Sequence, residues 1–482
     1  MIYIPISLIV VFLAVIIIKA YMHKPVENSY EKLTCKYEIN VSNTALKLSE
    51  AIKSRTISHS DYSEFDFTEF DRFHEILKKS FPLVHSELEL VKVNDYSLLY
   101  KWNGNNDKLL PGMFMAHIDV VPIEKGTEND WTYEPFSGAI EDGFVWGRGA
   151  MDIKVQVITM LEACELLLSK GFKPNRTLYF SFGHDEETDG RNGARKVLDH
   201  LIKNDIELEF VMDEGGCVNI GGFPSVSKPV AFMGIAEKGY LNVRVDIKGE
   251  GGHASTPPVN SSLGLAAKAI CRLEKKKMRL RLIKPVKTMI EALGRHMALP
   301  GRLVLANLWI FKPVFTRLFT KPGTTGEALL RTTIAPTMAE GSMEPNVLPQ
   351  TSSFTVNCRI LQGETSADVI KHIAWACRGM DFTTTILRYE EPSSVSSHES
   401  EFFRKAAGAV MGISEDIAIV PYLMVAGTDS IKFQGISKDT IRFTPYIIEH
   451  SDLNKIHGTN ERISIENIGN CVSYYSALFN SM

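Results

Sequence analysis

Residues 181–187 read Ser181-Phe182-Gly183-His184-Asp185-Glu186-Glu187, so an apolar stretch runs directly into a cluster of acidic groups. Residues 177–182 are rich in β-branched and aromatic side chains, which predicts a buried parallel strand ending at that cluster. Adjacent carboxylates repel one another there, and burial raises the pKa of each unless a cation is near. The pattern alone is also typical of a solvated loop or a helix cap, but a bound metal ion would relieve both costs.

The composition is that of a globular protein. The chain has 482 residues, of which 44% are hydrophobic and 23% charged, enough for two domains with separate cores. Its formal net charge of −4 argues against a nucleic-acid partner. The seven cysteines are scattered and form no Cys-x-x-Cys pair, so we expect neither a disulfide framework nor a cysteine zinc site. Any zinc here must be bound by His, Asp and Glu.

The N-terminus is hydrophobic. Residues 1–18 carry no charge, Lys19 and Lys24 follow, and no small-x-small cleavage site is evident. This predicts a membrane-anchoring signal over residues 1–24 rather than a cleaved one. The positive-inside rule would then place the body in the cytosol, whereas glycosylation sequons at Asn40, Asn175 and Asn260 matter only in the secretory lumen. These two signals disagree.

A second strand end carries a histidine and a carboxylate. Residues 112–119 read Gly-Met-Phe-Met-Ala-His-Ile-Asp, so His117 and Asp119 stand two residues apart and lie on one face of the strand. A lone histidine at a strand end is often structural. A carboxylate that accepts the second ring N–H is, however, the usual companion of a metal-bound imidazole.

Two further carboxylates follow the same plan. Asp152 stands at the start of a long apolar helical run, where an aspartate is usually a helix cap. It also occupies the third glycine position of a Gly-x-Gly-x-x-Gly pattern, and its negative charge there argues against a loop that binds the pyrophosphate of a dinucleotide. A strand over residues 208–212 ends at Asp213. Because open α/β folds place their sites at the carboxyl edge of the sheet, we expect His117, Asp152, Glu187 and Asp213 to meet there.

The pattern changes at Tyr240. Residues 240–390 alternate and then follow a β-α-β-β-α-β order, which predicts a separate inserted domain. Within it, residues 285–324 are apolar with embedded basic groups, typical of packed helices, with an apolar substrate lip or a membrane contact as alternatives. The chain then returns to the first domain, where His457 supplies a second imidazole.

Six ordered motifs carry a family resemblance. They are residues 116–122 (Ala-His-Ile-Asp-Val-Val-Pro), 147–154 (Gly-Arg-Gly-Ala-Met-Asp-Ile-Lys), 183–187, 211–216, 251–255 (Gly-Gly-His-Ala-Ser) and 457–461 (His-Gly-Thr-Asn-Glu). The chain thereby resembles the co-catalytic dizinc aminoacylase and carboxypeptidase family. Residues 309–313, 331–333 and 442–446 also resemble its N-fatty-acyl-amino-acid synthase/hydrolase and carboxypeptidase S branch.

The resemblance implies an α/β fold of the zinc exopeptidase type, a mixed sheet flanked by helices, with an inserted α+β ferredoxin-like lid or dimerisation domain. The catalytic domain would comprise residues 25–239 and 391–482, and the inserted domain residues 240–390. A homodimer through the inserted domain and a location in the secretory pathway, as a single-pass membrane protein or as a secreted or lumenal one, are also expected.

The resemblance also implies roles for individual residues. One zinc would be held by His117 and Asp213, the other by Glu187 and His457, with Asp152 bridging the two. The remaining roles fall to Asp119, which would orient His117; Glu186, the general base of the metal-activated water; His253, a donor to the oxyanion from the inserted domain or a partner subunit; and Asn346 and Arg359, which would contact the carboxylate end of the substrate.

The implied activity is hydrolysis of the amide bond of N-acyl amino acids with apolar or fatty acyl chains, with condensation as the reverse reaction. Two alternatives stay open: a carboxypeptidase or dipeptidase acting on short peptides at the same site, and a catalytically silent, membrane-anchored binding protein. Ile153 and Ile431 depart from residues common in relatives, but no ligand position is lost. A serine hydrolase is disfavoured because the chain has no Gly-x-Ser-x-Gly elbow.

Overall fold

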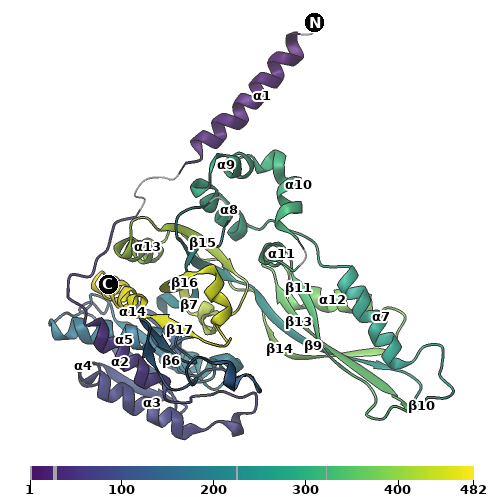
Figure 1. Cartoon of the computed structure of the whole chain (residues 1–482), viewed down its shortest axis with the longest axis horizontal. Coiled ribbons are helices and arrows are strands. Elements are labelled where there is room, and N and C mark those ends of the chain that lie inside the picture. The colour runs from purple at the N-terminus through teal and green to yellow at the C-terminus, as the bar shows by residue number, and fades with distance from the viewer. Residues whose placement is uncertain (1–2, 25–29, 224–225, 322) are drawn as a thin grey trace.

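A large mixed sheet forms the body of the molecule (Figure 1). The computed structural model describes residues 3–24, 30–223, 226–321 and 323–482. The eight strands run in the order β1-β2-β6-β3-β7-β16-β8-β15. Their bounds are β1 (Glu89–Val93), β2 (Ser97–Trp102), β3 (Gly112–His117), β6 (Leu178–Gly183), β7 (Leu208–Ile220), β8 (Val230–Glu237), β15 (Ala418–Met424) and β16 (Ser437–Glu449).

The centre of this sheet is parallel. β3 runs parallel to β6 and β7, and β7 runs parallel to β16, whereas β1 and β2 pair antiparallel at one edge. The predicted buried strand at residues 177–182 is confirmed as β6, whose six residues are all buried. The carboxyl ends of β3 and β6 therefore meet at one edge and present His117 and the acidic cluster together.

Helices cover both faces of the sheet. Phe114 and Ala116 of β3 belong to a core shared with helices on one face, and Met113 and Met115 belong to a core with α6 on the other. The apolar run at residues 154–169 forms α5, whose neighbours α2 and α14 bury it almost completely. The covering helices are α2 (Val41–Ile52), α3 (Phe67–Ser80), α4 (Pro82–Glu87), α5 (Lys154–Ser169), α6 (Ala194–Lys203), α13 (Glu401–Ile413) and α14 (Ile465–Asn480).

β7 is longer than expected from the sequence, because the strand continues through Asp213 to Ile220 instead of ending at Met212. Its pairing with β16 extends past the acidic residues as far as Ile220, opposite Glu449. Gly216 permits this, since a Cβ atom there would lie 1.7 Å from the carbonyl oxygen of Phe232. Asp213 consequently lies within a strand rather than at a strand end.

The inserted unit, residues 239–390, lies beside the body (Figure 1). Its four-stranded antiparallel sheet has the order β11-β13-β9-β14, and α7 and α12 pack on one face around a core of their own. The bounds are β9 (Gly239–Lys248), β10 (Gly252–His253), α7 (Ser262–Lys275), β11 (Thr333–Glu340), β12 (Val347–Leu348), β13 (Thr351–Ile360), α12 (Ser366–Ala376) and β14 (Phe382–Glu390).

Four helices interrupt the inserted unit between α7 and β11. They are α8 (Lys284–His296), α9 (Leu299–Leu305), α10 (Leu308–Phe319) and α11 (Thr325–Leu330). Met289, Leu293 and Leu330 share a core with Val420 and Leu423 of the body's edge strand β15. The apolar stretch at residues 285–324 is therefore mainly packed helix, as its composition predicts.

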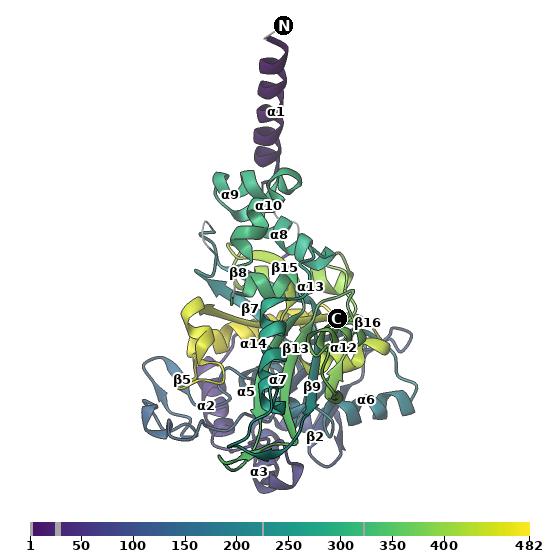
Figure 2. The same ribbon diagram turned by 90° about the vertical axis from the view of Figure 1, so that its right-hand side faces the viewer.

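α1 (Tyr3–Met22) projects from the top of these helices (Figure 2). At its base the Asn307 side-chain amide donates to the Ile16 carbonyl over 3.0 Å, and the Lys19 ammonium lies 5.2 Å from the centre of the Trp309 ring. Within the described ranges no helix is both long and apolar enough to cross a membrane. The predicted membrane anchor over residues 1–24, of which Met1 and Ile2 lie outside the described residues, is therefore not supported.

Candidate metal centre and substrate cavity

His117 closes β3 with its ring held from one side. Its Nδ1–H donates to the backbone carbonyl of Asp119 over 2.9 Å, because a carbonyl only accepts, and Nε2 is directed away from that carbonyl toward the acidic cluster. The Asp119 carboxylate is fully buried and accepts from the backbone N–H groups of Glu186 and Glu187 at 3.1 and 3.2 Å. Asp119 thus holds the His117 loop against the acidic cluster after β6.

Asp152 lies between two imidazoles. Its Oδ1 is 3.2 Å from Nε2 of His117 and its Oδ2 is 3.0 Å from Nε2 of His457. The same His457 nitrogen lies 3.1 Å from Oε1 of Glu187. One carboxylate therefore faces both histidines with separate oxygens, which is the arrangement a bridging ligand needs.

The neighbouring carboxylates Asp213 and Glu214 have different surroundings. Glu214 Oε1 lies 3.3 Å from Nε2 of His117, and Glu214 lines the cavity described below. Asp213 accepts instead from the backbone N–H groups of Ser430 and Glu214, both at 2.9 Å. The structure thus brings Glu214 to the histidine, and it places Asp213, the residue expected there from the sequence, behind it.

Burial and mutual repulsion perturb these carboxylates. Burial raises the pKa of Glu186 well above its ordinary range, and burial together with the charge of Asp152 raises the pKa of Glu187 to about 7. Hydrogen bonds to Asp152 and Glu187 raise the pKa of His457 to about 10. The cluster is therefore short of positive charge at neutral pH.

The donor set fits divalent metal ions. Two groups of side chains each bring their ligand atoms within 4.8 Å of one another: His117, Glu186 and Glu214, and His117, Asp152 and Glu187. Imidazole nitrogens and carboxylate oxygens are zinc ligands, and a cation would offset the repulsion among the buried carboxylates. The residues present thus suit a metal centre with His457 as a further imidazole.

A buried ion pair supports Asp152 and His457 from behind. Arg148 and Glu461 pair at 2.7 Å, and both side chains are at most 2% exposed. Glu461 accepts from the backbone N–H groups of Met151 and Asp152 at 2.8 and 3.1 Å, while Arg148 donates to the His457 carbonyl over 3.1 Å. This pair joins two segments that lie about 300 residues apart in the sequence.

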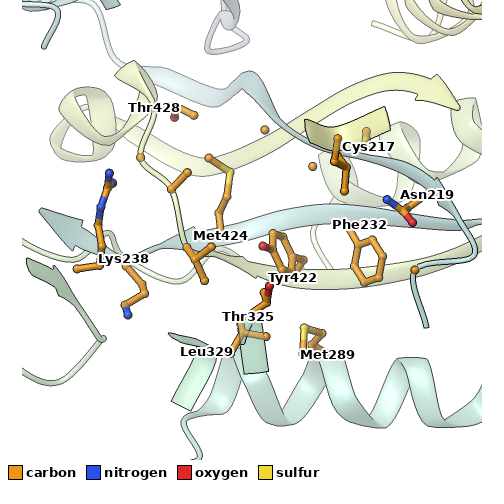
Figure 3. A pocket seen from close by; sticks show the side chains of 18 of the residues that line it. Cys217, Asn219, Phe232, Lys238, Met289, Thr325, Leu329, Tyr422, Met424 and Thr428 are labelled. Atoms are coloured by element: carbon orange, nitrogen blue, oxygen red, sulfur yellow. The ribbon is translucent and has the colours of Figure 1, made fainter. Parts of the chain in front are cut away.

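The acidic cluster opens into a large cavity of about 1320 Å³, and Figure 3 shows part of the lining of this cavity. Away from the acidic residues the cavity is apolar, and side chains from β8 and β15 face α8 and α11 across it. We call this part the apolar chamber and define it by Phe232, Met289, Leu293, Phe315, Leu329 and Tyr422. The cavity is also lined by Glu186 and Gly427 and by four residues with polar side chains, Lys238, Tyr240, Arg359 and Arg388.

The predicted substrate residues are not all brought together. Arg359 lines the cavity. His253 and Asn346 do not line it; both are exposed and adjoin one another at the far end of the inserted unit, where the Ala254 N–H donates to the Asn346 carbonyl over 3.0 Å. Within the described part of this single chain, neither residue reaches the acidic cluster.

Some residues of the site were not expected from the sequence. Glu214 could have been considered because it adjoins Asp213, but two consecutive carboxylates give no local signal of which one points inward. The positions of Arg388 and Glu461 in the site depend on long-range packing. The only sequence signal for Glu461 is its place in the His-Gly-Thr-Asn-Glu motif.

The sequence is similar to those of known proteins. Residues 113–481 match the model of peptidase family M20/M25/M40. The chain is 38% identical to a probable carboxypeptidase S-like 2 from Dictyostelium discoideum (89% of this chain and 83% of the relative), and 33% identical to the N-fatty-acyl-amino acid synthase/hydrolase PM20D1 of Xenopus tropicalis (98% and 92%).

A solved structure shares the fold. The M20 family metallo-carboxypeptidase Sso-CP2 from Sulfolobus solfataricus superposes with a TM-score of 0.68 at 18% identity, covering 91% of this chain and 98% of its own. The predicted α/β fold with a large mixed sheet is thereby confirmed.

Proposed function

The chain belongs to peptidase family M20/M25/M40 and is a metallohydrolase, and on that premise we propose that it hydrolyses the amide bond of N-acyl amino acids with apolar acyl chains. Condensation of a fatty acid with an amino acid would be the reverse reaction at the same site. The ratio of substrates to products would then set the direction of net turnover.

The cavity is the observation that carries this proposal. A single space joins the apolar chamber, the acidic cluster and the guanidinium of Arg359. An N-acyl amino acid carries the three matching parts: an apolar chain, an amide bond and a carboxylate. Burial of each CH₂ group of the chain would contribute about 0.8 kcal/mol to binding, which favours long chains.

We propose two zinc ions at the acidic cluster. His117 and Glu214 would hold one, Glu187 and His457 the other, and Asp152 would bridge both. This assigns to Glu214 the role that the sequence suggested for Asp213, since Glu214 Oε1 lies 3.3 Å from Nε2 of His117 and belongs to a group of candidate ligands with His117 and Glu186. The metals would supply Lewis acidity and an activated water.

Glu186 would carry the proton. Its carboxylate lines the cavity at the acidic cluster, and burial raises its pKa, which favours taking a proton from the attacking water and passing it to the leaving amine. Asp119 fixes the backbone of Glu186 and so sets the position of this base. His253 and Asn346 could act only from a second subunit or after a large movement of the inserted unit, and both roles stay predictions.

The test compares N-oleoyl-leucine with leucyl-leucine as substrates of the full chain loaded with zinc, alongside Glu186→Gln. We expect the wild type to cleave the acyl substrate with the higher kcat/KM. Glu186→Gln should lose at least about 100-fold in kcat, the order expected for loss of a general base, and should retain its metal, as measured by mass spectrometry.

Glu75→Gln, an exposed carboxylate on α3, is the matched control and should leave kcat unchanged. Cleavage of the dipeptide alone would instead support the carboxypeptidase or dipeptidase alternative. Retention of full activity by Glu186→Gln would contradict its role as the base.

A secretory-pathway location stays a prediction from the sequence. Asn40, Asn175 and Asn260 are all exposed, as acceptors of N-linked glycans must be.

A further inference from the structure

Two guanidinium groups share one aromatic ring in the cavity wall. The Cζ atoms of Arg359 and Arg388 each lie 4.6 Å from the centre of the Tyr240 ring, and all three residues line the cavity. Arg359 on β13 is the direct cross-strand partner of Tyr240 on β9. Arg388 comes from β14, on the other side of β9.

A β-bulge in β14 turns the Arg388 side chain to the face of the inserted unit's sheet that carries Tyr240. Ile386 pairs with Val243, but Arg388 pairs with Asn242, so one extra residue, Leu387, is inserted between them. Without the bulge Arg388 would stand opposite Leu241, which is fully buried against the helices of the inserted unit. Bulges of this kind re-aim side chains and are frequent beside functional sites.

The two arginines lack the partners expected of packed cations. Among the described residues Arg359 has no ion pair, and Arg388 has only Asp189 at 4.0 Å, a carboxylate that is already paired with Arg191 at 2.7 Å. Burial and the neighbouring charge of Arg388 lower the pKa of Arg359. Each guanidinium is attracted to the ring, but the two like charges repel one another, and an anion bound by both would offset that repulsion.

We infer that Arg388 is the second arm of an anion clamp, in which Arg359 and Arg388 together bind the carboxylate of the substrate's amino acid against Tyr240. The inference rests on the proposed function and adds to it one residue, Arg388, that helps to select substrates with a free carboxylate. Guanidinium groups bind carboxylates through two parallel hydrogen bonds, and two such groups can use all the acceptor positions of one carboxylate.

The clamp is tested by binding, so that the result does not depend on turnover. Calorimetry would compare N-oleoyl-leucine with N-oleoyl-leucinamide on the full chain in the Glu186→Gln background, which should bind the acid without cleaving it, with the wild-type clamp, with Arg388→Ala and with Arg388→Lys. We expect the wild-type clamp to bind the acid about 10- to 100-fold more tightly than the amide, the range for one or two hydrogen bonds to a charged group. Arg388→Ala should lose most of this preference, and Arg388→Lys should restore part of it.

Arg378→Ala is the matched control, since Arg378 also stacks on a ring, that of Trp375 at 4.4 Å, but is exposed and does not line the cavity. Equal binding of acid and amide by the wild-type clamp, or an unchanged preference in Arg388→Ala, would overturn the clamp. Turnover of the same acid is measured separately: if it is cleaved while Arg388→Ala keeps its preference, only the clamp fails, and if it is bound selectively but not cleaved, only the proposed function fails.

Discussion

Glu461 shows how a residue without access to the cavity can decide the geometry of a metal centre. It is fully buried, and it binds the backbone of Asp152 directly and that of His457 through Arg148. The two candidate ligands come from loops that share no secondary structure element. Their separation is therefore set by one carboxylate and one guanidinium.

Glu461→Gln should weaken metal binding as well as activity. The substitution keeps an acceptor but leaves the buried guanidinium of Arg148 uncompensated, which typically costs about 3–5 kcal/mol of stability. We expect a lower free energy of unfolding in urea and faster loss of zinc to a chelator. Glu141→Gln, an exposed carboxylate on β4 (Ile140–Glu141), should change neither quantity, and equal zinc retention in both variants would contradict the positioning role.

At the scale of elements, α8 to α11 build most of the apolar chamber. These helices fill the gap between α7 and β11 in the inserted unit and pack on the edge strand β15 of the body. They thus bring apolar side chains from an insertion into the same cavity as the acidic residues. If the chamber binds the acyl chain, as proposed, the size of this helical insertion would determine how long a chain the cavity can accept.

Gly301→Leu should shift the preference of the enzyme toward shorter acyl chains. Gly301 on α9 lines the cavity, and a Cβ atom there would meet only the flexible end and stem of Met297, which can move aside. A leucine side chain would then occupy part of the chamber. We expect kcat/KM to fall about 10-fold or more for N-oleoyl-leucine, because about two to three CH₂ groups lose their burial, and to change little for N-octanoyl-leucine.

Val314→Leu, on the exposed side of α10, is the control and should leave both values unchanged. A parallel loss for both chain lengths in Gly301→Leu would argue against the chamber as the acyl site.

At the scale of the whole molecule, Lys238 lies where the body meets the inserted unit. It separates β8 from β9, and its ammonium donates to the carbonyls of Ala328 and Arg331 over 2.9 and 2.8 Å. Burial, and then the charge of Arg359, lower the pKa of Lys238 from 10.5 to about 7, against the opposing charge of Glu364. This junction is therefore sensitive to pH.

The stability contributed by Lys238 should rise with pH above 7. Between about pH 7 and 10.5 the unfolded chain binds the proton that the folded chain releases, so folding is favoured as pH increases. We expect the free energy of unfolding of the wild type, relative to Lys238→Met, to increase by about 1–2 kcal/mol from pH 7 to pH 9. The exposed control Lys248→Met should show no such slope, and a flat difference for Lys238→Met would contradict the lowered pKa.

Local patterns in the amino-acid sequence are enough to predict the fold class and the residues that stand at strand ends. His117 and Glu187 follow buried strands, and a parallel sheet brings such ends to one edge whatever the distant contacts are. The prediction that a strand ends at Asp213 was wrong, because β7 continues through this residue to Ile220.

Which side chains face the cavity depends on contacts between segments that are distant in the sequence. Glu214 and Arg388 owe their direction to strand register and to a bulge, and both are set by hydrogen bonds to strands distant in sequence. The apolar chamber likewise requires an insertion to pack on β15. Residue types and spacing encode what chemistry is available, but long-range packing fixes which of those groups meet.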